Sequence, residues 1–281
     1  ISTTYQNLSY DVKIGDRILL DDGSIELEAL SVEKGKVSCR VVRGGLLKEN
    51  KGINLPGVDV SAPSMTEKDK RDLNFGIKVG VDYVALSFVR TAGDLVYIKN
   101  ILKKQGCDIP VIAKIEKPEA VKNIDTIIEA ADAIMVARGD LGVELNPEKV
   151  PTIQKLIIKK ARMANRPVIT ATQMLESMIE NMIPTRAEAS DVANAILDGT
   201  GAVMLSGETA SGKYPVESVK MMKKIAIEIE ASPFMRYNLH FEKNPEDMVT
   251  HAVAQSAVNI LHEVNAKAII AFSVSGKTSK L

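Results

Sequence analysis

The chain has 281 residues, of which 45% are hydrophobic, so it can bury the core of one large domain or of two to three smaller ones. Its 36 Lys and Arg residues balance its 36 Asp and Glu residues, which excludes a global field that would attract nucleic acid or an acidic membrane surface. No apolar run approaches the roughly 20 residues that span a bilayer, and the two cysteines show no metal-binding spacing, which is typical of a reducing cytoplasm.

Residues 1–62 have the pattern of a small β-rich domain. The apolar runs Ile18–Leu20 and Ile25–Leu30 flank the sequence Asp-Asp-Gly at positions 21–23. An Asp-Gly pair between apolar runs is a strong signal for a β-hairpin. A third strand is predicted at Lys36–Val42, after the glycine at position 35.

Residues 63–231 alternate short apolar runs with amphipathic helical patterns such as Pro147–Asn165 and Ala187–Leu197. Continuous rather than alternating apolar runs are typical of parallel strands that are covered on both faces. Such βα repeats build either a (β/α)8 barrel or an open doubly wound sheet, and the lack of a GxGxxG motif after a strand favours the barrel. The predicted strands are Tyr83–Phe88, Val111–Ile115, Ala133–Ala137, Pro167–Ala171 and Ala202–Leu205, which are five of the eight strands of such a barrel.

Residues 232–281 resemble the opening of a further α/β domain. They contain a predicted helix at Glu246–Val264, a predicted strand at Ala268–Phe272 and the polar loop SVSGKTSK. Because the chain begins at Ile1 without an initiator Met and stops just after this loop, we expect a piece of a longer protein. The fold predicted from these patterns is α/β: a β-rich N-terminal segment, a partial (β/α)8 TIM barrel, and the start of a C-terminal α/β domain.

Charged side chains lie at the ends of two predicted neighbouring strands. Lys114 and Glu116 are two residues apart and so project to one face, and Asp140 follows the next strand beside Gly139. Two carboxylates at one barrel rim suit Mg²⁺, and a lysine beside the metal would stabilise a developing enolate or phosphoryl oxygen. The alternatives are a structural Lys114–Glu116 ion pair and a surface pair between Arg138 and Asp140.

Two threonines are predicted at the next strand end. Thr170 and Thr172 are expected on one face of the rim, where a hydroxyl can donate to a substrate carboxylate or relay a proton through water. The equally weighted alternative is that a threonine here caps the helix that follows.

The segments NKGINLPG, KIEKPEA, IMVARGDLGVE, ATQMLESM, PTRAEASD and MLSGETASGKYPVE, in this order, resemble the pyruvate kinase family over nearly the whole chain. The resemblance implies phosphoryl transfer from phosphoenolpyruvate to ADP, which gives pyruvate and ATP in glycolysis. It implies that residues 1–62 are the latter part of a small β-barrel lid domain, inserted into the TIM barrel and closing over the nucleotide. It also implies that residues 63–231 carry barrel strands four to eight and that residues 232–281 begin an α/β effector domain.

The resemblance also implies roles for single residues. Lys114 would stabilise the enolate and Thr172 would belong to the proton route. The residues that would bind phosphoenolpyruvate are Lys114, Gly139, Asp140 and Thr172. Mg²⁺, or Mn²⁺ in its place, would be held by Glu116 and Asp140, with Ser87 beside K⁺. Lys51 and Asp22 of the lid would meet the nucleotide, for which a solvated lysine and a turn-forming aspartate are the plain alternatives.

Further expectations from the resemblance concern regulation and assembly. The loop residues Ser273, Ser275, Gly276, Lys277, Thr278 and Ser279 would cradle the phosphate of an allosteric effector, with a plain polar turn as the alternative. Arg186 and Glu188 are candidates for a subunit interface of a cytoplasmic homotetramer.

The barrel strands that would precede Ile1 supply further ligands in the family, so we predict that residues 1–281 alone are inactive. Two other interpretations remain open at this point. One is another Mg²⁺-dependent barrel that handles a pyruvate enolate, such as a class II aldolase or lyase, and the other is a non-catalytic truncated scaffold.

Overall fold

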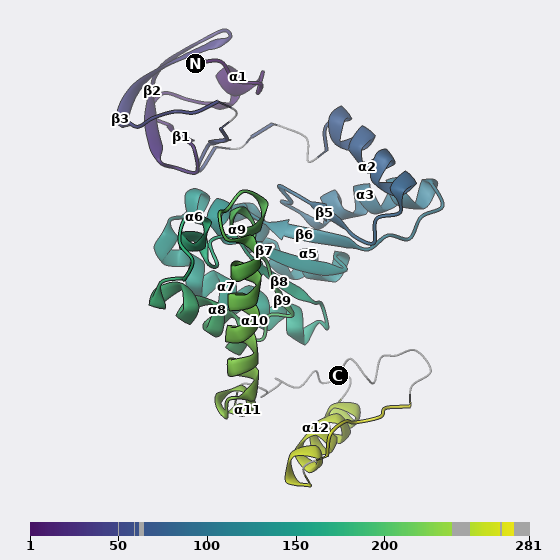
Figure 1. The fold of residues 1–281 in the computed structure, drawn as a ribbon. Coiled ribbons are helices and arrows are strands. Elements are labelled where there is room, and N and C mark those ends of the chain that lie inside the picture. Colours follow the sequence, from purple (N-terminus) through teal and green to yellow (C-terminus); the bar gives the residue numbers. More distant parts are fainter. Residues whose placement is uncertain (50, 59, 62–64, 238–247, 265, 273–281) are drawn as a thin grey trace.

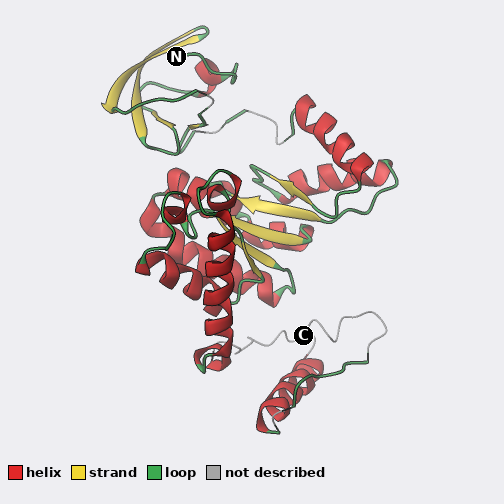
Figure 2. Ribbon diagram, viewed as in Figure 1, coloured by secondary structure: helices red, strands yellow, loops and turns green. Residues whose placement is uncertain are grey.

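The computed structural model describes residues 1–49, 51–58, 60–61, 65–237, 248–264 and 266–272. Within them a small antiparallel sheet and a larger parallel sheet form separate parts, joined by the segment that follows the small sheet (Figure 1). Figure 2 shows the parallel strands flanked by helices, which is the α/β arrangement that the apolar runs predict.

The small sheet has the strand order β3-β2-β1-β4, and every neighbouring pair is antiparallel. Its elements are α1 (Leu8–Asp11), β1 (Arg17–Leu20), β2 (Ile25–Glu33), β3 (Lys36–Arg43) and β4 (Ile53–Asn54). The predicted hairpin is confirmed: Asp21, Asp22 and Gly23 all have positive φ, the left-handed backbone that a tight turn requires. Ile18, Leu20 and Ile25 bury their side chains in a core beneath the sheet. The closure of this four-stranded sheet into a small β-barrel remains a prediction.

The parallel sheet has the strand order β5-β6-β7-β8-β9, so neighbours in space are also neighbours in sequence. Its strands are β5 (Val84–Leu86), β6 (Val111–Ile115), β7 (Ala133–Ala137), β8 (Val168–Ala171) and β9 (Ala202–Val203). All five predicted strands are confirmed: β6 and β7 have the predicted bounds, and β5, β8 and β9 are shorter than predicted. A sheet that adds each strand on the same side has no point at which the strand order reverses, unlike a doubly wound sheet. This order is that of an arc of a (β/α)8 barrel, and closure of the barrel remains a prediction.

Helices connect and cover these strands. They are α2 (Glu67–Val79), α3 (Ala92–Lys104), α4 (Pro118–Lys122), α5 (Ile124–Ala130), α6 (Arg138–Leu145), α7 (Val150–Met163), α8 (Arg186–Leu197), α9 (Gly207–Ala210) and α10 (Pro215–Ala231), with short 3₁₀ turns at Pro147–Lys149 and Glu176–Ile179. The predicted helix Ala187–Leu197 is confirmed as α8, which begins one residue earlier at Arg186. Its start is capped, because the Thr185 side chain accepts from the Glu188 N–H while the Glu188 carboxylate accepts from the Thr185 N–H.

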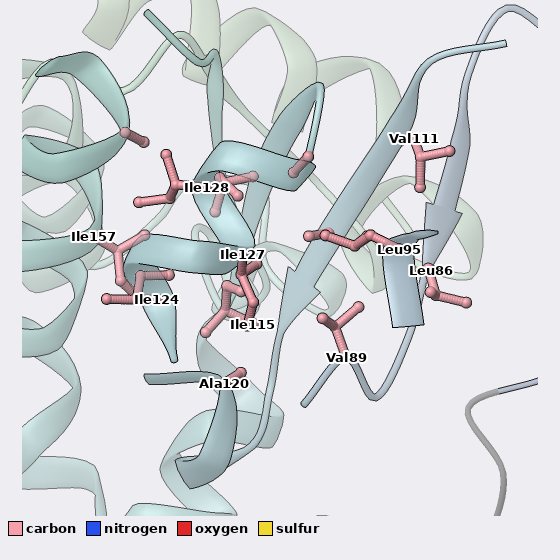
Figure 3. Close-up of a cluster of buried hydrophobic side chains, with 14 of the residues drawn as sticks. Leu86, Val89, Leu95, Val111, Ile115, Ala120, Ile124, Ile127, Ile128 and Ile157 are labelled. Atoms are coloured by element: carbon pink, nitrogen blue, oxygen red, sulfur yellow. The ribbon is translucent and has the colours of Figure 1, made fainter. Parts of the chain in front are cut away.

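Alternation along the strands separates two faces of the parallel sheet. Val111, Ile115, Ile134 and Val136 pack against Leu95, Ile127 and Ile157 of the covering helices, as Figure 3 shows for the labelled members of this cluster. The opposite face buries Ile112, Met135 and Ala171 in a smaller cluster. Lys114 lies in register with Met135 and therefore belongs to this second face, which is the interior of the barrel arc.

The C-terminal part differs from the prediction in one element. The predicted helix is confirmed as α12 (Met248–Glu263), which follows α11 (Phe234–Tyr237). The predicted strand Ala268–Phe272 is wrong: these residues adopt no regular structure, and Ile270 and Phe272 are 82% and 93% exposed. A strand requires a ladder partner for its N–H and C=O groups, and none of the strands in the described ranges pairs with this segment.

None of the helices in the described ranges is long and apolar enough to cross a membrane.

Candidate active site

The carboxyl end of β6 brings together the two charged residues that the strand period places on one face. Lys114 Nζ lies 2.6 Å from Glu116 Oε1 and donates a hydrogen bond to Ser87 Oγ at 2.8 Å. The Glu116 side chain is only 3% exposed, and its Oε2 accepts a hydrogen bond of 2.9 Å from the backbone N–H of Phe88. An ammonium and a buried carboxylate are thus fixed at the barrel rim, with Ser87 from the end of β5 beside them.

Asp140 belongs to the first turn of α6, which begins directly after β7. The side chain therefore lies just beyond the end of this strand. Burial, followed by the negative charge of Glu116, raises the pKa of Asp140, and the positive charge of Lys114 opposes this shift. These mutual influences mean that Lys114, Glu116 and Asp140 share one electrostatic environment. The helix N-terminus favours the ionised carboxylate at this position.

Arg138 does not form the surface pair with Asp140 that the sequence left open. Its guanidinium is buried and lies 2.5 Å from Asp191 Oδ2 of α8. It also donates to the carbonyl of Thr172 at 2.8 Å and to that of Gln173 at 2.9 Å. Arg138 therefore ties the end of β7 to the loop that follows β8.

Thr172 lies in that loop with φ of 66°, and Gln173 follows with φ of 53°. Its hydroxyl accepts a hydrogen bond of 2.8 Å from the backbone N–H of Gly139. A Cβ added at Gly139 would lie 3.4 Å from the Thr172 hydroxyl oxygen, so the glycine permits this close approach. Because Asp140 directly follows Gly139 in the chain, the bonded pair of Gly139 and Thr172 lies at the same rim as Asp140.

The expectation that Thr170 and Thr172 share one face at the rim is wrong. Thr170 is fully buried in register with Val136, on the helix-facing side, and its hydroxyl bonds with that of Thr200. Because β8 ends at Ala171 and Thr172 has positive φ, strand alternation no longer applies to Thr172. A cap role for Thr172 is not seen either, since its hydroxyl bonds with Gly139 and Ala171.

The tip of the β1–β2 hairpin carries Asp22, whose charge adds to the upward shift of the Asp140 pKa. Lys51 lies 2.7 Å from Asp21 Oδ1, and the pKa of Lys51 is raised by this hydrogen bond and further by the charge of Asp22. The hairpin tip and Lys51 therefore form one charged group that reaches toward the rim.

A cavity of about 820 Å³ lies beside the contact between this hairpin and α6 and is lined by Asp22, Arg138 and Gly139 among others. Lys114, Glu116 and Asp140 do not line it, and it borders the charged rim through Arg138, Gly139 and Gln173. The arrangement leaves room for a large ligand between the small sheet and the barrel arc.

Among the described residues, no group of three or more His, Cys, Asp and Glu side chains could hold a metal ion. A divalent cation here would therefore rest on the two carboxylates of Glu116 and Asp140 and on ligands from other molecules. That donor set fits Mg²⁺, which takes one or two carboxylates and keeps several other oxygen ligands. The close pair of like charges that raises the Asp140 pKa would be relieved by such a cation.

The loop residues expected to bind an effector, Ser273, Ser275, Gly276, Lys277, Thr278 and Ser279, lie outside the described residues.

Sequence reasoning missed the contacts of Phe88 with Glu116 and of Arg138 with Asp191. Arg138 and Asp191 are 53 positions apart in the sequence, so no local pattern predicts their contact. The position of Arg138 directly after a predicted strand was the signal that pointed to a role for this residue.

Comparison with known proteins gives a match of residues 1–219 to the family model described as "Pyruvate kinase, barrel domain". The whole chain is 53% identical to a protein of Geobacillus stearothermophilus and covers 49% of that protein. It is 51% identical to a protein of Corynebacterium glutamicum, of which it covers 58%, and 52% identical over its whole length to one of Mycobacterium intracellulare, of which it covers 59%. All three relatives are named pyruvate kinase, and the chain spans about half the length of each.

Proposed function

Because the chain belongs to the pyruvate kinase family, we propose that the protein carrying it transfers a phosphoryl group from phosphoenolpyruvate to ADP. The bond between the enol oxygen and phosphorus breaks, a bond from a terminal ADP oxygen to phosphorus forms, and the enolate takes a proton at its methylene carbon. The products are pyruvate and ATP.

The convergence of Lys114, Glu116 and Asp140 at one rim carries this proposal. Phosphoryl transfer needs little covalent chemistry from the protein and depends on positioning and on offsetting negative charge. Lys114 Nζ, fixed by Glu116 and Ser87, supplies a positive charge beside the enolate oxygen. The buried carboxylate of Glu116 keeps that ammonium oriented.

Glu116 and Asp140 are the residues that would hold Mg²⁺ or Mn²⁺. The cation supplies charge neutralisation for the phosphoryl oxygens when it is bound. Both carboxylates must be ionised to bind it, and the N-terminus of α6 favours the ionised form of Asp140. Ser87, whose hydroxyl accepts a hydrogen bond from Lys114, is assigned to a position beside K⁺.

Thr172 and Gly139 are assigned to phosphoenolpyruvate. The backbone N of Gly139 and the hydroxyl oxygen of Thr172 lie 2.8 Å apart, so the two groups are held together where we expect the substrate to bind. We also assign the Thr172 hydroxyl to the route by which a proton reaches the methylene carbon. Asp22, which lines the 820 Å³ cavity, and Lys51, which interacts with Asp21 and Asp22, are assigned to ADP and ATP.

The wider organisation follows the family. We assign residues 1–62 to the lid, residues 63–231 to barrel strands four to eight, and residues 232–281 to the start of an effector domain in a cytoplasmic homotetramer. Within the described ranges the parallel sheet has five strands, and β5 does not pair with β9. A (β/α)8 barrel needs three further strands, so we expect residues 1–281 by themselves not to turn over substrate.

The test is an assay of pyruvate formation from phosphoenolpyruvate and ADP with the product of the gene that encodes this chain. Activity that requires Mg²⁺ supports the proposal. A purified, folded gene product that forms no pyruvate at saturating phosphoenolpyruvate, ADP, Mg²⁺ and K⁺ would refute it.

A further inference from the structure

The loop after β8 has two successive residues in an uncommon backbone conformation. Thr172 and Gln173 have φ of 66° and 53°, although neither is glycine. The left-handed region is unfavourable for residues that carry a Cβ, so two of them in succession keep it only where their surroundings impose it. The contacts that impose this conformation also hold the Thr172 hydroxyl in its place at the rim.

The guanidinium of Arg138 binds the carbonyls of both residues. Its Nε and Nη2 donate to the Thr172 carbonyl at 3.2 and 2.8 Å, and Nη2 also donates to the Gln173 carbonyl at 2.9 Å. A planar guanidinium presents its donors in a rigid fork and so fixes the direction of the acceptors that it meets. Because the carbonyl directions depend on the backbone angles, Arg138 holds the loop in its left-handed form.

Asp191 of α8 is the acidic partner of this guanidinium. Arg138 Nη1 lies 2.5 Å from Asp191 Oδ2, and the arginine side chain is 8% exposed whereas that of the aspartate is 41% exposed. In the part of the chain that the structure describes, no other carboxylate forms an ion pair with Arg138. A buried cation requires such a counter-charge, and the bond to Nη1 also fixes the rotation of the guanidinium about its own axis.

The other end of the same loop is held separately. The N–H of Leu175 donates a hydrogen bond of 3.0 Å to the carboxylate of Glu208, which is fully buried. Glu208 belongs to α9 and also accepts a hydrogen bond of 2.8 Å from the N–H of Ser206. Loss of Asp191 should therefore loosen the Thr172 end of the loop and leave the Leu175 end in place.

We propose that Asp191 is a positioning residue for the reaction: it orients Arg138, and Arg138 holds the Thr172 hydroxyl at the rim beside Gly139. This inference rests on the proposed function, which assigns Thr172 to the substrate and to the proton route. Asp191 lines the 820 Å³ cavity and acts on the reaction only through these two residues.

Asp191→Ala in the full gene product should lower turnover by about tenfold or more, because a small misplacement of a reacting group is costly. Asp191→Asn keeps an oxygen that accepts from Arg138 and should retain most of the activity. Asn194→Ala is the control, since Asn194 is an exposed residue one turn further along α8 at the wall of the same cavity. Circular dichroism checks folding, and wild-type turnover in Asp191→Ala would overturn the proposal.

A double-mutant cycle with Thr172→Val separates positioning from general damage to the fold. Where the hydroxyl is absent, Asp191 has nothing left to position. Asp191→Ala should therefore change turnover by less than about twofold in the Thr172→Val background. A further loss of about tenfold there, equal to the loss in the wild-type background, would mean that the two residues act independently and would overturn the proposal.

Hydrogen exchange at the Gly139 amide gives a readout that needs no activity. In Asp191→Ala the Thr172 hydroxyl should release this N–H, and its exchange should be about tenfold faster or more, whereas the Leu175 N–H should exchange as in the wild type. Unchanged exchange at Gly139 would overturn the proposal. A wild-type gene product that forms no pyruvate would refute the proposed function, and the exchange at Gly139 would still decide whether Asp191 holds Thr172.

Discussion

The hydroxyl of Thr172 accepts a 2.8 Å hydrogen bond from the backbone N–H of Gly139, and this bond joins the loop after β8 to the helix that carries Asp140. The bond exists because Thr172 departs from strand geometry, with φ of 66°. A bulky residue in the left-handed region keeps this conformation only where its surroundings impose it. The rim is thus shaped by a contact between a loop and a helix as well as by the strand ends.

Arg138→Met should lower the free energy of unfolding by about 3 kcal/mol, because Asp191 and two loop carbonyls lose their buried donor. Urea titration followed by circular dichroism measures the change. The matched control is Arg71→Met, which alters an exposed residue of α2 and should shift stability by less than about 0.5 kcal/mol. Equal stability of the two variants would mean that Arg138 does not hold the loop.

Thr172→Val should lower turnover and also cost about 1 kcal/mol of stability, because the Gly139 N–H loses its acceptor. Thr172→Ser keeps the hydroxyl and should restore most of the activity. The ratio of the turnover numbers of the two variants separates the hydroxyl from the shape of the side chain. If serine is as impaired as valine, the hydroxyl is not the group that matters.

Much of the fold could be predicted because its signals are local. The five parallel strands appear as continuous apolar runs, and the hairpin at Asp21–Gly23 has residues that accept positive φ. Lys114 and Glu116 meet because the strand period of two places them on one face. These relationships need only the chain within a few residues of each position.

The rest depends on partners that are distant in sequence. Thr172 and Phe88 have positive φ without being glycine or asparagine, so no residue signal marks their turns. The ion pair of the buried Arg138 with the partly exposed Asp191 joins two helices through the tertiary fold. The segment Ala268–Phe272 has strand composition, but it pairs with none of the strands in the described part of the chain. Composition alone cannot supply a ladder partner.

The stability of the chain should depend on pH through Asp140. Its pKa in the folded state is raised above the ordinary value of 3.8, first by burial and then by Glu116. The folded state therefore binds the proton more tightly than the unfolded state does, and stability is lost as the pH rises from the ordinary value through the raised pKa.

Asp140→Asn removes this loss, so without metal the variant should gain stability over wild type as the pH rises, and should keep that advantage at neutral pH. Thermal unfolding in a pH series, with and without Mg²⁺, measures both effects. Mg²⁺ should raise the Tm of the wild type at neutral pH and leave that of the variant unchanged, because it binds the ionised carboxylate. An identical Mg²⁺ response in both proteins would remove Asp140 from the metal site.

Lys114→Met in the full gene product should reduce turnover by about a thousandfold or more, because the ammonium that offsets charge on the enolate oxygen is lost. The variant also leaves the buried Glu116 carboxylate without its ion-pair partner, which should cost about 3 kcal/mol of stability. Turnover is therefore measured well below the Tm of the variant, with Lys122→Met as the control at an exposed lysine of α4. Because the methionine keeps most of the aliphatic stem, the affinity for phosphoenolpyruvate should change far less than turnover. Near-normal turnover in Lys114→Met would show that the charge beside Glu116 is structural and that another group offsets the enolate.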